Sequence, residues 1–339
     1  MKCTIHTLHH PNEISSLTPT GNLAILYATA DTFIPYAKAC QEHFKDIQLI
    51  GCSTHKNLLA EGFITNATVI FLSDIEVSTY CLKDIGDYPI LHIHDIENTI
   101  EQLPSRIPDH TICFSLCTFT SHEEMVLNTL DPLLTSHHID LIGGTAATDS
   151  NNTSYVLLNQ TIESDACILT FITNKSGKIK LYKENIFYPT HDWFIATDVD
   201  IERRLIHKLD NKPCGQVLQK LLGTSDLESH FLNHPFGLVL DDDFYIVSGK
   251  QVHSDGIEYY SNIYKNATLC HLELGDYESI TKETVSKILK DIPNPSGTLA
   301  VNCILRTIQF ENEGFDKKFA SNLSKLGTFA GFSSFGEQI

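Results

Sequence analysis

The sequence has few basic residues for its length. Its 339 residues include 24 Lys and Arg against 42 Asp and Glu, which gives a formal net charge of −18 at pH 7. The isoelectric point is about 5.3. Nucleic acids and anionic membranes are bound through basic surfaces, so this composition argues against either as the main partner. No apolar stretch approaches the roughly 20 residues of a membrane-spanning helix. We therefore expect a soluble protein without membrane insertion.

The sequence also lacks the features of a secreted protein. Its 10 cysteines are scattered singly, unlike the dense framework of a small disulfide-rich domain. The first residues, MKCTIHTLHHPNE, contain no apolar run typical of a signal peptide. These features predict a protein of the reducing cytoplasm.

Motifs of common enzyme classes are absent as well. There is no G-x-S-x-G, no lysine after a glycine-rich turn of the P-loop type, and no H-E-x-x-H. Cys52 beside Gly51 suggests a nucleophile on a tight turn, but cysteine is also a common small core residue. We therefore predict that the protein is not an enzyme.

Three segments of the sequence follow the same pattern, namely 23–57, 111–149 and 298–337. Each has an apolar β-rich run, a polar loop, a helical pattern and a second short apolar run, and then Gly with small or hydroxyl residues. In the first copy, the apolar residues between the two runs fall at helical spacing: Phe33, Tyr36, Ala37 and Cys40. We predict three related strand-helix-strand-Gly units.

Strand-like runs follow the first two copies, at 63–73 and 154–172. Hairpin strands after parallel ones indicate an α/β fold of mixed sheets flanked by helices, instead of a purely parallel doubly wound sheet. The third copy reaches Ile339 where such strands are expected, so we expect the chain to lack its last strand.

The region between the second and third copies has a different pattern. A strand and a helix are predicted between 186 and 222, and an antiparallel meander over 236–274, with an acidic turn at 241–243 and a hairpin turn at Asp255-Gly256. A helix is predicted over 281–291. The length favours two domains, and the apolar pattern is interrupted near 176–188. We therefore expect modules at 1–182 and 183–339.

The glycines that end each copy allow two interpretations. A residue without Cβ permits a sharp turn, and it also permits another backbone or a ligand to approach closely. In Gly51-Cys52-Ser53-Thr54 the hydroxyl residues would cap a short helix beginning near His55, with free N–H groups facing a carboxylate or phosphate. The three Gly elements are therefore expected to line a binding cleft or to form the seam where the repeats pack.

Several motifs, in order, resemble those of the FIST family, whose FIST N and FIST C modules occur in bacterial signal-transduction proteins. They are LIGCSTHKNLLAEGF, DLIGGTAATDS, IERRLIHKLDNKPCGQVLQKLLG, HPFGL, VNCILR and GFSSFGE. The resemblance spans nearly the whole chain. It implies a sensory domain that binds a small ligand and signals to a partner such as a histidine kinase.

Within this resemblance the expected ligand is an amino acid or similar metabolite. Arg306 would hold a carboxylate and Glu337 an ammonium group, although the two would equally form a structural ion pair. The expected ligand-binding residues are Gly51, Cys52, Ser53, Thr54, Gly143, Gly144, Thr145, Asp149, Arg306, Gly331, Ser333, Gly336 and Glu337.

Two other functions are consistent with the sequence. The chain resembles stand-alone family members that include the NosP group of haem-binding nitric-oxide sensors, which implies haem b and a gas ligand. His234 and His191 are then the candidate axial ligands. The other alternative is a protein interaction module that binds no ligand.

Overall fold

The computed structural model of the chain describes residues 1–103, 109–120, 122–240 and 243–339. These residues form two compact units. Unit 1 comprises 1–182 and 284–339, and unit 2 comprises 183–283. The expected modules, 1–182 and 183–339, divide the sequence into consecutive parts, whereas the contacts group the last 56 residues, 284–339, with the first segment.

Unit 1 contains the three predicted strand-helix-strand repeats. In each repeat the two strands are parallel neighbours in one sheet. The first consists of β2 (Leu23–Thr29), α1 (Phe33–His43) and β3 (Gln48–Thr54); the second of β8 (Thr111–Cys117), α3 (Glu123–Ser136) and β9 (Asp140–Thr145); the third of β21 (Thr298–Cys303), α6 (Ile304–Asn312), α7 (Asp316–Leu323) and β22 (Phe329–Ser334).

The strands that follow each repeat link the repeats in a cycle. The hairpin strand after the second repeat pairs with β3, the short strand after the third pairs with β9, and the hairpin strand after the first pairs with β22. Each repeat therefore completes the sheet of another, and all three sheets are mixed. These strands are β4 (Asn57–Leu59), β5 (Gly62–Ile64), β10 (Val156–Leu158), β11 (Thr161–Glu163) and β23 (Glu337–Gln338).

Four more strands extend two of the sheets. They are β1 (Lys2–Leu8), β6 (Ala67–Ser73), β7 (Ile75–Lys83) and β12 (Ala166–Asn174). The sheets have the orders β1-β6-β2-β3-β10-β11, β23-β9-β8-β12-β7 and β21-β22-β4-β5. The mixed α/β architecture predicted from the sequence is confirmed.

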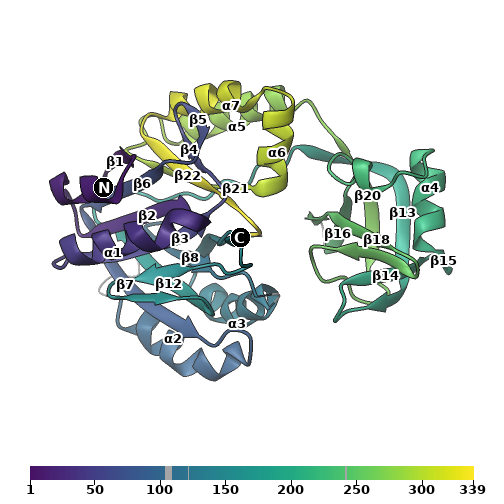
Figure 1. Cartoon of the computed structure of the whole chain (residues 1–339), viewed down its shortest axis with the longest axis horizontal. Coiled ribbons are helices and arrows are strands. Elements are labelled where there is room, and N and C mark those ends of the chain that lie inside the picture. Colours follow the sequence, from purple (N-terminus) through teal and green to yellow (C-terminus); the bar gives the residue numbers. More distant parts are fainter. Residues whose placement is uncertain (104–108, 121, 241–242) are drawn as a thin grey trace. The chain divides into compact units, whose positions relative to one another are not determined.

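The main core of unit 1 lies between the sheets, and helices cover their outer faces (Figure 1). Tyr27, Phe114 and Phe332, one from each repeat, are among its buried side chains. The buried face of α1 covers β2 and β3, and α2 (Ile93–Glu101) and α3 cover β8 and β12. Aromatic rings of α6 and α7 pack together beside β5.

Unit 2 is an eight-stranded antiparallel sheet system built around one long strand, β13 (Phe187–Asp200). The other strands are β14 (Leu205–Leu209), β15 (Lys212–Pro213), β16 (Phe236–Leu240), β17 (Asp243–Val247), β18 (Gly249–His253), β19 (Gly256–Tyr259) and β20 (Thr268–Leu274). The predicted helix is α4 (Cys214–Leu222), which ends at Gly223 in a left-handed conformation.

The predicted antiparallel strands of unit 2 are present, but they do not form a simple meander. The strand order is β17-β16-β20-β13-β14-β19-β18, so β13 and β14 lie between β20 and β19. The hairpin turn is formed by residues 254 and 255, and Gly256 already belongs to β19. A Cβ at Gly256 would lie 2.4 Å from the Ile206 carbonyl oxygen, so glycine is needed there for close strand contact. Residues 241–242 of the predicted acidic turn lie outside the described residues.

Helix α5 (Tyr277–Asp291) confirms the helix predicted over 281–291. Its Val285 and Ile288 pack against Leu326 in unit 1. The short 3-10 helices are η1 (Pro11–Ser16), η2 (Ala30–Thr32), η3 (Pro89–His92), η4 (Glu228–His230) and η5 (Ser324–Leu326). Among the described residues, no helix is long and apolar enough to cross a membrane.

Candidate functional site

The three Gly elements lie inside strands, and the helix expected near His55 does not exist. Residues 51–54 are the buried end of β3, and β4 begins at Asn57. The strand continues because β3 stays paired with β2 as far as Thr54. The Ser53 hydroxyl donates to the Ala147 carbonyl at 2.7 Å instead of capping a helix. The prediction that this element presents free N–H groups to a ligand is therefore wrong.

Glycine is required at the same register position in every repeat. A Cβ built on Gly51 would lie 2.5 Å from the Leu26 carbonyl oxygen, one on Gly143 2.2 Å from that of Ser115, and one on Gly331 2.3 Å from that of Ala300. In each case the carbonyl belongs to the residue paired with the glycine on the first strand of the repeat. These glycines therefore let the two parallel strands approach closely.

The same elements are also joined to the next strand by equivalent hydrogen bonds. The N–H of Ser53 donates to the Tyr155 carbonyl at 2.9 Å, that of Thr145 to Gly336 at 2.9 Å, and that of Ser333 to Lys56 at 2.8 Å. The Ser334 hydroxyl connects the second and third elements, since it accepts from the Thr145 N–H at 3.0 Å and donates to the Gly336 carbonyl at 2.6 Å.

Three more of the predicted residues, Gly144, Cys52 and Asp149, have structural roles. Gly144 leaves room for side chains of the third repeat, because a Cβ there would lie 2.6 Å from the Ser334 hydroxyl and 2.8 Å from a Val301 methyl group. Cys52 is fully buried, and burial raises the pKa of its thiol well above the ordinary value, which disfavours a nucleophilic thiolate. Asp149 accepts hydrogen bonds from the Asn151 and Thr153 N–H groups and from the Tyr155 hydroxyl, and so closes its own loop.

Arg306 and Glu337 are close enough for the Arg306 charge to act on the Glu337 carboxyl, and Cys303 forms a hydrogen bond with that carboxyl. Arg306 lies in the first turn of α6, with its guanidinium 5.0 Å from the Phe310 ring centre and 4.8 Å from that of Phe319. Stacking on two rings restricts the guanidinium to one place. Glu337 is an exposed residue of β23, held against the second repeat by its pairing with Gly144.

The carboxyl of Glu337 has an unusual proton affinity for an exposed residue. The surrounding protein deprives the group of hydration, which raises its pKa to about 7, against the opposing effect of the Arg306 charge and a hydrogen bond from the Cys303 thiol. Burial and the Glu337 charge in turn raise the pKa of Cys303 to about 12. At neutral pH this cluster of Cys303, Arg306 and Glu337 therefore holds a thiol, a cation and a carboxyl that titrates.

A buried hydrogen-bond network fixes α6 to the strands beneath it. The Asn302 side-chain N–H donates to the Thr307 hydroxyl at 2.8 Å, and that hydroxyl lies 2.7 Å from the Ser333 hydroxyl. Thr307 also donates to the Cys303 carbonyl at 3.1 Å. Sequence reasoning missed Asn302, Cys303 and Thr307 as site residues, although Asn-Cys directly before an amphipathic run is a signal for a helix start.

The proposed haem histidines are both in unit 2, in different settings. His191 is exposed on β13. His234 is half-buried and stacked between His230 and His271, and its Nδ1 lies 3.2 Å from the His271 Nε2. Burial lowers the pKa of both His234 and His271, so both rings are neutral near pH 7. Within the described residues, no group of three His, Cys, Asp or Glu side chains is placed to hold a metal ion.

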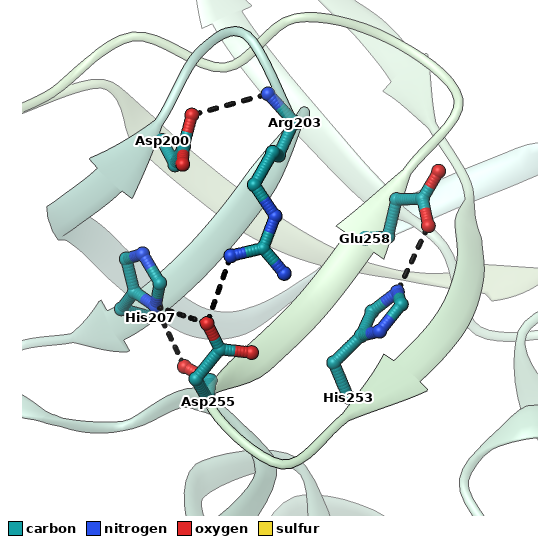
Figure 2. A network of polar contacts seen from close by, with 6 residues as sticks. All are labelled: Asp200, Arg203, His207, His253, Asp255 and Glu258. Carbon is teal, nitrogen blue, oxygen red and sulfur yellow. Dashed lines mark hydrogen bonds and ion pairs between the residues drawn. The ribbon is translucent and has the colours of Figure 1, made fainter.

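A second polar network ties together two turns of unit 2 (Figure 2). Arg203 donates to the Asp255 carboxylate at 2.9 Å, and the His207 ring lies 2.7 Å from the Asp255 carbonyl oxygen. His253 and Glu258 form a separate pair at 2.9 Å. Arg203 and Asp255 are about half-exposed, so the contribution of their ion pair to stability is small. Their geometry connects the β13–β14 turn to the β18–β19 hairpin.

Unit 1 also has a cavity at the amino ends of β8 and β9, which sequence reasoning missed. Its volume is about 350 Å³, and Asp109, Thr111, His138 and Asp140 line it together with isoleucine side chains. The second Gly element, and the pairing of Glu337 with Gly144, are at the opposite, carboxyl end of β9. The cavity is therefore separate from the cluster of Cys303, Arg306 and Glu337.

Comparison with known proteins identifies the family, although the boundary between the two matching family models, at 212–215, lies inside unit 2. The family model for the FIST N domain matches residues 22–212, and that for the FIST C domain matches residues 215–339. No curated protein matches the chain. Together the two matches extend over nearly all of the sequence. The chain therefore belongs to the FIST family, whose domains are sensory domains of signal-transduction proteins.

Proposed function

We propose that this chain is a non-enzymatic sensor that binds a zwitterionic small molecule, such as an amino acid, at Arg306 and Glu337. The observation that supports this most is a guanidinium stacked on two rings at the start of α6, whose charge acts on the carboxyl of the exposed Glu337 in β23. The ligand carboxylate would bind the planar fork of Arg306, and its ammonium group would bind Glu337. The buried Gly elements position these residues and are not themselves contacts.

The proton on Glu337 then makes binding depend on pH. Because the pKa of this carboxyl is raised to about 7, a large part of the population is protonated at neutral pH. Only the ionised form attracts an ammonium group strongly. Ligand affinity is therefore expected to rise as the pH increases from 6 to 8.

A screen of the common amino acids by thermal shift, followed by calorimetry, tests this proposal. Arg306→Gln and Glu337→Gln are each expected to weaken binding by at least about tenfold, because each leaves one charge of the ligand unpaired. Arg203→Gln in unit 2 is the matched control and should bind normally, since Arg203 is a largely exposed arginine paired with Asp255. Unchanged affinity in both cluster variants would remove the cluster from the site.

The second candidate ligand is a gas bound to haem, and the stacked histidines favour His234 over His191. A hydrogen bond between the His234 Nδ1 and His271 would leave the Nε2 of a neutral ring to bind iron, as axial histidines require. Haem would supply the iron that binds nitric oxide. A Soret band lost in His234→Ala and kept in His191→Ala would support this candidate; a flat spectrum of haem-supplemented protein would exclude it.

We propose that the output is a protein of a bacterial signalling pathway in the cytoplasm, such as a histidine kinase. Sensory domains of this family belong to signal-transduction proteins. If neither an amino acid nor haem binds, a ligand-free interaction module is the function that this chain supports next.

A further inference from the structure

The second repeat of unit 1 carries charge of almost one sign. Segment 84–174, which includes the second repeat, contains 13 Asp and Glu residues, a single arginine, Arg106, no lysine and six histidines. This segment supplies α2 and α3, the helices that cover the outer face of the sheet containing β7, β12 and β8 (Figure 1). The exposed acidic residues beside and along the two helices are Asp84, Asp87, Asp95, Glu101 and Asp131. The helical layer therefore presents a negative potential to solvent.

An unusually exposed apolar group lies at the start of this layer. Tyr88, Ile90 and Leu91, in and beside η3, are 66%, 53% and 77% exposed. We call these three residues the η3 tip. Single exposed apolar residues are ordinary, but three large ones within four positions form a patch that needs a reason.

The η3 tip is held in place by contacts on both sides of it. Pro89 is buried between the exposed residues. The Tyr80 hydroxyl of β7 lies 2.8 Å from the His92 Nδ1, and the Leu91 N–H donates to the Tyr88 carbonyl at 3.0 Å. The apolar side chains are therefore directed to solvent by a fixed turn.

The η3 tip also lies at a definite edge of the sheet. Both β7 and β8 run antiparallel to β12, so η3 after β7 and the start of α3 after β8 are at the same edge. η3 packs against α3, whose first turn carries Met125, 40% exposed. The exposed Phe119 at this edge contacts Phe335, two residues before Glu337.

We propose that the η3 tip and the acidic outer faces of α2 and α3 form a docking site for a basic amphipathic segment of a protein partner. The apolar side of such a segment would cover Tyr88, Ile90 and Leu91, and its Lys and Arg side chains would meet the surrounding carboxylates. The negative charge of α2 and α3 favours a basic partner. A second copy of this chain would bring carboxylates against carboxylates, which opposes self-association. The site is independent of the ligand proposed for Arg306 and Glu337.

The test uses the full chain and a defined probe. The probe is a fluorescein-labelled 18-residue helical peptide with leucine on one face and lysine on the other, and the reference peptide has glutamate in place of lysine. We expect the lysine peptide to bind with a dissociation constant in the micromolar range, as measured by anisotropy. The double variant Ile90→Ser/Leu91→Ser should bind at least about tenfold more weakly, because the anchors of the apolar face are lost.

A charge variant and a control separate the two parts of the site. Glu97→Lys/Glu101→Lys should also weaken binding about tenfold and reduce its dependence on salt, because it reverses two carboxylates of α2. Ile201→Ser, at a 42% exposed isoleucine of unit 2, should bind like the unmodified chain.

Three results would overturn the proposal. They are no binding of the lysine peptide at concentrations up to about 1 mM, equal binding of the glutamate peptide, and unchanged affinity in Ile90→Ser/Leu91→Ser. Sedimentation of the unmodified chain gives a fourth. A dimer that forms with rising concentration and is lost in the same variant would assign the patch to a second copy of the chain.

Discussion

One backbone position occurs three times in unit 1, with three different side chains. Val156 pairs with Cys52 of the first repeat, Glu337 with Gly144 of the second, and Asn57 with Phe332 of the third. Val156 is buried in the main core, and Asn57 is buried with partners for both ends of its amide. Glu337 alone is exposed, and Arg306 lies within its electrostatic reach.

This difference separates architecture from chemistry. The repeated features are backbone features, namely the glycine beside a carbonyl and the N–H of the second strand that donates to the next repeat. They recur because three parallel strand pairs meet the same steric demand. A chemical site arises only where a repeat places a titratable group at a position that its equivalents use for packing. The predicted site residues therefore fall into a buried group that builds the scaffold and a small group, Arg306 and Glu337, that we propose as the ligand contacts.

The largest expected effect tests the shared steric demand. Gly143→Ala should destabilise unit 1 by about 2–4 kcal/mol, because its Cβ would lie 2.2 Å from the Ser115 carbonyl oxygen and the paired strands would have to separate. Denaturant unfolding measures the change. Gly215→Ala is the control, since no atom lies within 4 Å of a Cβ there, and in α4 it should stabilise by about 0.5 kcal/mol. If Gly143→Ala leaves the free energy of unfolding unchanged, close approach of the paired strands does not explain the glycines.

The next prediction compares substitutions at two of the equivalent positions, Asn57 and Glu337. Asn57→Leu should cost about 2–3 kcal/mol, because the carbonyls of Tyr27 and Asn66 and the Thr54 hydroxyl would lose buried partners. At pH 4, where the Glu337 carboxyl keeps its proton in the folded chain, Glu337→Leu should change the free energy of unfolding by less than about 0.5 kcal/mol, because the residue is exposed. Denaturant midpoints of the two variants give the comparison, and similar losses in both would contradict it.

The backbone architecture of unit 1 was more predictable from the sequence than the chemistry of its side chains. The repeats were visible because buried helix faces and strands keep their periods, as the apolar residues of α1 show. The mistaken cap at His55 has the opposite cause. Ser53 and Thr54 favour a helix start locally, but pairing with Thr29 and the contact with Ala147 keep them in a strand. Residues 284–339 join the first segment through pairings with β4 and β9, which no local pattern encodes.

The site was predictable only in part for a related reason. Arg306 and Glu337 were found because their motifs resemble those of a family, and spacing alone did not connect them. The proton affinity of Glu337 depends on Cys303 and on the density of protein around it, which are properties of the fold. The order of strands in unit 2 was missed because antiparallel strands of similar composition pair in several orders. Long β13 takes the central position by pairing with both β14 and β20.

The smallest expected effect concerns the proton on Glu337. The pKa of Glu337 is about 7 in the folded chain, above its ordinary value of 4.5. Between these pH values the folded chain keeps a proton that the unfolded chain releases, so stability falls as the pH rises through this range. Glu337→Gln removes this loss and should raise Tm by about 1–3 °C at pH 8, with no change at pH 4. Glu42→Gln, at an exposed carboxylate of α1, controls for the loss of charge. An equal shift in both variants at both pH values would show that the proton on Glu337 is not the cause.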